Sequence, residues 1–127
     1  MAKVDLAELE AVCRSWPTPE SDRARLRALL LRIRIERVVE GLPDTIIMAA
    51  PASRRLEHRL RLSVGEPGLD APDRARRLQV ISAAIAAYRA VCDLLHGRNP
   101  DPNPPLQDVK AWTEAVGALE RELDTPA

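Results

Sequence analysis

The stretch Arg74 to His96, RARRLQVISAAIAAYRAVCDLLH, decides the fold. At helical spacing it carries an apolar stripe with alternating steps of three and four residues: Leu78, Ile81, Ile85, Tyr88, Cys92 and Leu95. A second stripe runs beside the first: Val80, Ala84, Ala87, Val91 and Leu94. The two stripes together are wider than a surface helix needs, so we expect the other helices to enclose this one.

Three further segments have the pattern of helices that cover this stretch. Residues 5–16 begin with a capping box and end at Pro17, and their one apolar face consists of Leu6, Leu9, Cys13 and Trp16. Residues 52–62 predict a helix that buries Leu56 and Leu60. The last helix is expected from about residue 106 to 124, with a seam of Val109, Trp112, Val116, Leu119 and Leu123.

The ends of the central helix carry their own signals. Asp70 precedes Pro72 and Asp73, which is typical of a helix N-cap. Gly97 follows His96 at the point where a left-handed residue ends many helices. We therefore expect the helix to begin just after Asp70 and to end near Gly97.

Residues 22–42 are ambiguous. As a helix they have two apolar faces, one with Leu26, Leu29, Leu30 and Ile33, the other with Leu31, Ile35, Val38, Val39 and Leu42. Residues 31–36 also alternate strictly between apolar and charged, as do residues 60–64, and alternation is the period of a strand. The helical pattern before residue 31 favours a helix. A small hairpin from residues 31–39 and 60–64, within an α+β fold, is the alternative.

The chain of 127 residues is thus expected to form one domain, an all-α bundle of four to five helices around the central hydrophobic helix. Residues 98–105 hold four prolines and predict a stiff linker inside that domain. Both cysteines lie on apolar stripes, so we expect Cys13 and Cys92 to be reduced core thiols. The first residues lack the apolar run of a signal peptide, which favours a cytoplasmic protein.

Charge is unevenly distributed although the formal net charge is zero. Residues 22–62 hold ten Arg and five acidic residues, which leaves +5, whereas the segment from residue 100 holds six acidic and two basic residues, which leaves −4. A basic face can neutralise phosphates of nucleic acid, and the candidate residues for a nucleic-acid or partner site are Arg23, Arg27, Arg34, Arg54, Arg55, Arg59 and Arg61. The other interpretation is that the basic and acidic helices are neighbours in the bundle.

One spacing has a catalytic interpretation. Arg89 and His96 are seven residues apart, so two helical turns place both on the same face of the central helix, with Asp93 between them. This spacing resembles that of the HEPN superfamily of small helical bundles, which implies a metal-free ribonuclease with His96 as acid or base and Arg89 stabilising phosphate charge. The sequence departs from the family at Ala90, where a polar residue is usual. The structural interpretation is that Arg89 pairs with Asp93.

No zinc pattern, phosphate-binding loop or nucleophile elbow is present, so we expect no metal, no cofactor and no small-molecule substrate. The surplus of apolar helix surface favours a non-catalytic interaction or assembly module, oligomeric or part of a larger complex, without a membrane partner. A nucleic-acid-binding subunit and a ribonuclease that uses Arg89 and His96 are the two alternatives.

Overall fold

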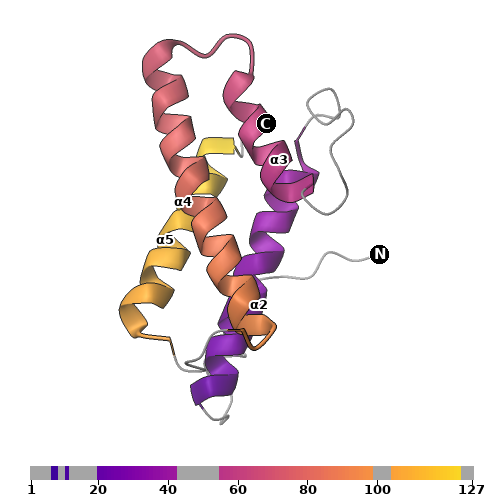
Figure 1. Cartoon of the computed structure of the whole chain (residues 1–127), viewed down its shortest axis with the longest axis vertical. Coiled ribbons are helices and arrows are strands. Elements are labelled where there is room, and N and C mark those ends of the chain that lie inside the picture. The colour runs from indigo at the N-terminus through magenta and orange to yellow at the C-terminus, as the bar shows by residue number, and fades with distance from the viewer. Residues whose placement is uncertain (1–6, 9–10, 12–19, 43–54, 99–103, 124–127) are drawn as a thin grey trace.

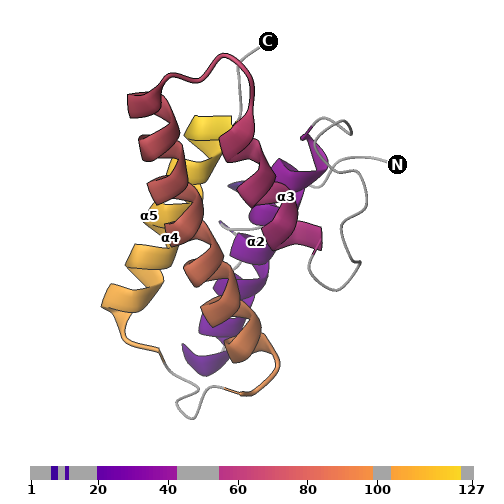
Figure 2. The ribbon, with the colours of Figure 1, turned by 45° about the horizontal axis from the view of Figure 1, so that its top comes forward.

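The computed structural model describes residues 7–8, 11, 20–42, 55–98 and 104–123, and it is an all-α bundle. Its helices are α2 (Glu20–Glu40), α3 (Arg55–Leu62), α4 (Ala71–Leu95) and α5 (Leu106–Leu123), and a short 3-10 turn, η3 (Ser63–Gly65), follows α3. Figures 1 and 2 show α4 running antiparallel to both α2 and α5 and lying against them. The short α3 packs beside the C-terminal end of α2 and the first half of α4.

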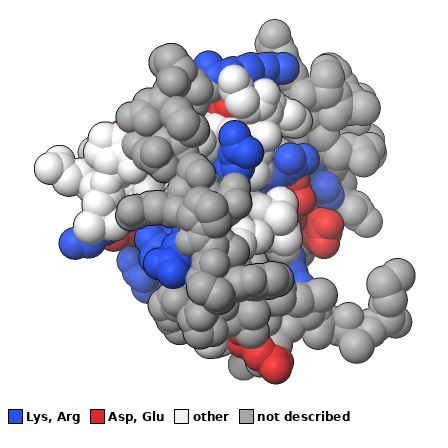
Figure 3. Space-filling view, turned by 90° about the horizontal axis from the view of Figure 1, so that it is seen from below, with Lys and Arg blue, Asp and Glu red and all other residues white. Residues whose placement is uncertain are grey.

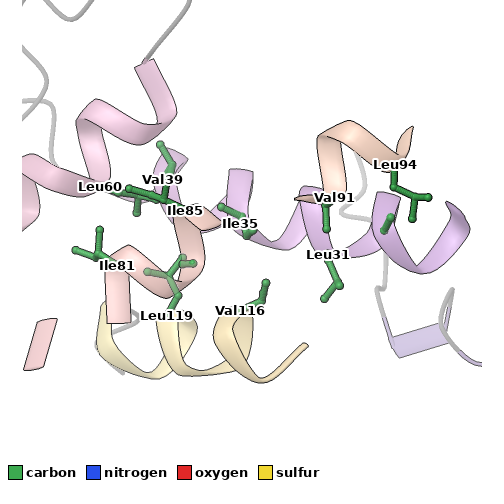
Figure 4. Close-up of a cluster of buried hydrophobic side chains, with 12 residues drawn as sticks. Leu31, Ile35, Val39, Leu60, Ile81, Ile85, Val91, Leu94, Val116 and Leu119 are labelled. Carbon is green, nitrogen blue, oxygen red and sulfur yellow. The ribbon is translucent and has the colours of Figure 1, made fainter. Parts of the chain in front are cut away.

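The core lies where these helices face one another (Figure 4). It is built from one side of each helix, and its buried members are Ala28, Leu31, Ile35, Val39, Leu60, Ile81, Ala84, Ile85, Val91, Leu94, Val116 and Leu119. Ala28 and Ala84 have small side chains, which permit close approach of α2 and α4. Burial of each larger aliphatic side chain contributes about 1.5–3 kcal/mol, so this shared core holds the four helices together.

Both ends of α4 are as the sequence predicts. The Asp70 carboxylate accepts a hydrogen bond from the Asp73 backbone N–H at 2.8 Å, which satisfies one donor of the first turn. At the other end Gly97 has a φ of 68°, a left-handed conformation that favours glycine. The helix therefore stops at Leu95, with His96 as its C-cap.

The hairpin alternative is wrong, because residues 31–39 lie within α2 and residues 60–64 lie in α3 and η3. No strand occurs in the described residues. The apolar packing explains why: Leu31, Ile35 and Val39 fall on one side of a helix and all three are buried in the core.

The expectation that the other helices enclose α4 is wrong in part. Its inner side is buried, but Leu78, which belongs to the first predicted stripe, is 49% exposed. Ser82, Ala83 and Ala86 on the same side are exposed as well. Among the described residues α4 is thus one of three long helices packed together, with an open outer face. Most of the expected helix over residues 5–16 lies outside the described residues, as do Cys13 and most of the proline-rich linker.

Candidate interaction surfaces

Arg89 and His96 both lie on the exposed side of α4, as their spacing predicts. Two guanidinium nitrogens of Arg89 donate to the two carboxylate oxygens of Glu57 in α3, each at 2.7 Å. The hydrogen bonds and the negative charge of Glu57 raise the pKa of Arg89 above its usual value. The predicted pairing of Arg89 with Asp93 is therefore wrong: the partner comes from another helix, which periodicity along α4 does not reveal.

His96 is the C-cap of α4 and its side chain is exposed. Its backbone N–H donates to the Cys92 carbonyl at 2.9 Å, so the residue helps to close the last turn. The Arg89 charge is compensated by Glu57 in this arrangement. A phosphate would have to displace that carboxylate before it could use the guanidinium.

The Arg-rich candidates divide between two helices. Arg23, Arg27 and Arg34 share one side of α2, and Arg59 and Arg61 belong to α3. Arg54 and the side chain of Arg55 lie outside the described part of the chain.

Arg34 pairs with an acidic residue of the C-terminal helix. Its Nε donates to Glu120 of α5 at 3.1 Å, and a second nitrogen also contacts this carboxylate. On the face seen in Figure 3, the Lys and Arg side chains of described residues form several separate groups, with acidic and uncharged side chains near them. At Arg34, therefore, the basic segment and the acidic helix are neighbours that neutralise each other.

A buried cluster of ionic side chains lies at the end of the bundle where α4 begins. The sequence pattern does not predict this cluster. Arg77 Nε lies 3.2 Å from the Glu122 carboxylate, and each side chain is only 10% exposed. Arg77 also donates to the Ser63 carbonyl at 3.1 Å and pairs with Glu66. Arg76 contacts the same Glu122 at 3.1 Å. We call these residues the Arg77 cluster; it joins η3, α4 and α5.

A second polar group lies between α2 and α4. Arg32 donates to Glu36 at 2.8 Å, and this pair lies close to Tyr88 and Cys92 of α4. Burial, together with Cys92 and Glu36, raises the pKa of Tyr88 to about 12, so its hydroxyl stays protonated at neutral pH. Cys92 is a free, half-buried thiol. In the described residues no group of three His, Cys, Asp or Glu could hold a metal ion.

The outer face of α4 is an open surface without charged side chains. Between the charged positions Arg76 and Arg89 its exposed side chains are all uncharged, and most are small: Leu78, Gln79, Ser82, Ala83 and Ala86. We call these five residues the α4 strip. By length and composition α4 could also cross a membrane, a property it shares with core helices of soluble bundles. Its buried inner side accounts for much of that apolar character.

A scan against protein-family models finds no match, and searches of curated proteins and of solved structures find none either.

Proposed function

We propose that the chain is a non-catalytic helical interaction or assembly module, acting as an oligomer or as a subunit of a larger complex. The observation that carries the proposal is the exposed α4 strip. It is uncharged for about two helical turns, on the longest helix of the described bundle. An open helix face without charges and with small side chains allows a second helix to pack closely against it.

The chemistry of the strip suits another helix. Ser82, Ala83 and Ala86 have short side chains, so a partner helix can approach at the lower end of the usual interaxial range of about 8–10 Å. Leu78 is 49% exposed and gains about 1 kcal/mol when the rest of its surface is buried. Gln79 and Ser82 supply hydrogen-bonding groups within such a contact.

The charges around the strip are already paired within the molecule. Arg76 contacts Asp73 and Glu122, and Arg89 contacts Glu57. These ion pairs favour a partner with an uncharged face over a phosphate polymer. The cytoplasmic location and the absence of a membrane partner belong to the same proposal, and fractionation of the cells that make the protein tests them.

The test places a charge on the strip. Ala83→Glu puts an unpaired carboxylate where a partner helix would lie, which disfavours association. Ala111→Glu is the matched control, because Ala111 is also an exposed alanine within a helix but lies on α5. Sedimentation velocity over a wide concentration range measures self-association, and purification of the tagged chain from its native cells measures the retention of other subunits.

We expect Ala83→Glu to lose the oligomer or the co-purifying subunit and Ala111→Glu to keep it. The proposal is overturned if the unsubstituted chain is monomeric at all concentrations and carries no stoichiometric partner. It is also overturned if both variants associate as the unsubstituted chain does. Circular dichroism of both variants shows whether each retains its helices.

A further inference from the structure

The open side of α4 carries a regular seam that extends beyond the α4 strip. Its members recur at alternating steps of three and four residues: Arg76, Gln79, Ala83, Ala86, Ala90 and Asp93. Five of them are exposed, and Ala90 is half-buried. This spacing is typical of helices that pair along their length, because it keeps one line of side chains facing the partner helix. The seam therefore suits a second helix that lies along α4.

The order of residues along the seam is complementary to itself in the antiparallel direction. Arg76 lies seven residues before Ala83, and Asp93 lies seven residues after Ala86. A two-fold axis between Ala83 and Ala86 thus brings Arg76 of each copy level with Asp93 of the other. Every contact across a two-fold axis occurs twice, so opposite charges meet at both ends of the seam. A parallel pair would instead bring Arg76 against Arg76 and Asp93 against Asp93.

Small side chains occupy the middle of the seam. At the axis Ala83 of one copy meets Ala86 of the other, and Gln79 lies opposite Ala90. Because the alanine side chain is a single methyl group, the two helices can approach to about 8 Å, the lower end of the usual interaxial range. A second α4 therefore fits the seam in shape as well as in charge.

The charged ends of the seam are available to a second copy. Asp93 is exposed, and its carboxylate forms no ion pair with any described residue. Arg76 donates through Nε to Glu122 and through Nη1 to Asp73, which leaves Nη2 on a side chain that is 56% exposed. The two carboxylates hold the Arg76 guanidinium at its end of the seam. The described residues thus offer a positioned cation and an open carboxylate at equal distances from the axis.

We propose that the chain pairs with a second copy of itself through this seam, as an antiparallel α4–α4 dimer with its two-fold axis between Ala83 and Ala86. This dimer rests on the proposed interaction role of the α4 strip and names its partner. Charge complementarity selects both the partner and the orientation, since Arg76 of each copy contacts Asp93 of the other.

Charge reversal at the two ends tests the partner and its orientation together. Arg76→Glu puts a glutamate against Asp93 of the second copy, and Asp93→Arg puts an arginine against Arg76. Each variant alone is therefore expected to raise the Kd of self-association about tenfold or more. An equal mixture of the two variants restores opposite charges at both ends, so it should form heterodimers with nearly the Kd of the unsubstituted chain. Sedimentation velocity measures these Kd values.

The mixture is the decisive sample, because a general weakening of self-association would persist in it. Circular dichroism of Arg76→Glu and of Asp93→Arg shows whether each variant keeps its helices. A mixture that associates no more tightly than either variant alone overturns the antiparallel dimer.

Disulfide formation gives a second test that leaves the charges unchanged. With Cys13 and Cys92 replaced by serine, Gln79→Cys and Ala90→Cys are prepared as separate proteins, one with a mass tag, and mixed. The seam brings position 79 of one copy level with position 90 of the other, whereas equal positions lie about 16 Å apart along the helices. Since a disulfide needs Cα atoms within about 7 Å, mild oxidation should crosslink mainly the two different proteins. Crosslinks mainly between identical proteins, or none, overturn the proposal.

The outcomes also separate this dimer from the broader interaction role. If the unsubstituted chain is monomeric but retains another subunit that Ala83→Glu releases, the dimer is overturned and the interaction role stands. If Ala83→Glu abolishes self-association but the mixtures give neither rescue nor crosslinks between the two proteins, the strip pairs in another orientation. The antiparallel dimer is then overturned, and the interaction role again stands.

Discussion

The Arg77 guanidinium and the Glu122 carboxylate meet at 3.2 Å where α4 begins and α5 ends, with only 10% of either side chain exposed. Removing one partner of a buried ion pair leaves the other charge without its counterpart, which typically costs 3–5 kcal/mol. Arg77→Met keeps the aliphatic bulk but removes the charge. Since Arg76 still contacts Glu122, we expect a loss of about 3 kcal/mol of unfolding free energy in urea titration.

Arg76→Met is the matched control for that measurement. Arg76 contacts the same Glu122, but its side chain is 56% exposed, so its removal should destabilise the protein much less than Arg77→Met does. Equal losses in the two variants would mean that the depth of Arg77 in the bundle contributes nothing to stability.

The same carboxylate gives the protein an acid-sensitive stability. Burial alone raises the pKa of Glu122, but hydrogen bonds and positive charge from Arg76 and Arg77 outweigh it and hold the pKa below its usual value. A lowered pKa in the folded protein stabilises it fully above the unfolded-state value of about 4.3, and this contribution is lost as the pH falls through the folded-state value. We expect the urea midpoint to fall as the pH drops below about 5. The Glu122→Gln variant should show a shallower fall, and parallel pH profiles would contradict this assignment.

The Arg89–Glu57 pair bears on the ribonuclease alternative. Because both carboxylate oxygens of Glu57 engage Arg89 at 2.7 Å, we expect any RNA cleavage by the purified protein to be unchanged in His96→Ala. A true catalytic acid or base would give a loss of about 100-fold or more. Glu57→Gln adds a second test, since it weakens the hold on Arg89. An increase in cleavage that depends on His96 would favour the ribonuclease over the interaction module.

Local signals in the sequence predicted local structure well. The Asp70 cap and the stop at Gly97 depend on backbone geometry within a few residues, and both are confirmed. The seam of α5 is also confirmed, with Val116 and Leu119 buried and Trp112 packed against the core. Such features are set by helical periodicity, which the sequence displays directly.

Helical periodicity did not predict which residues of different helices meet. Leu78 lies on an apolar stripe but is largely exposed. Because α4 is apolar on nearly all sides, the positions of the neighbouring helices decide which side is covered. Arg77 is buried because Glu122, Glu66 and the Ser63 carbonyl converge on it from other elements. A charged residue at position 77 gives no hint of these partners in the sequence, so the cluster was missed.

The nucleic-acid alternative can be tested through salt dependence. Neutralisation of phosphates makes the logarithm of the binding constant fall linearly with the logarithm of salt concentration, by about 0.9 per phosphate contact. Because Glu120 already neutralises Arg34, we expect weak retention on heparin and no steep salt slope. Glu120→Gln should strengthen retention slightly. Tight binding that is lost in the double variant Arg23→Ala, Arg27→Ala would instead support a nucleic-acid interface.

Leu60 is the side chain of α3 that is buried in the core, and Leu56 packs against the core beside it. Leu60 is fully buried in the core, whereas Leu62, two residues later on the same helix, is 37% exposed. Leu60→Ala removes a core side chain and leaves a cavity, so we expect a loss of about 3 kcal/mol of unfolding free energy. Leu62→Ala makes the same chemical change at a partly exposed position that leaves no cavity in the core, so it should cost clearly less.

Hydrogen exchange distinguishes detachment of α3 from a general loss of stability. Eight residues are too few for a helix to persist alone in water, so α3 depends on its packing. The Arg89–Glu57 pair cannot replace Leu60, since an ion pair with an exposed partner contributes little to stability. In Leu60→Ala we therefore expect the amides of α3 to exchange faster than those of α4 and α5. A uniform acceleration across all helices would mean that α3 unfolds only with the whole bundle.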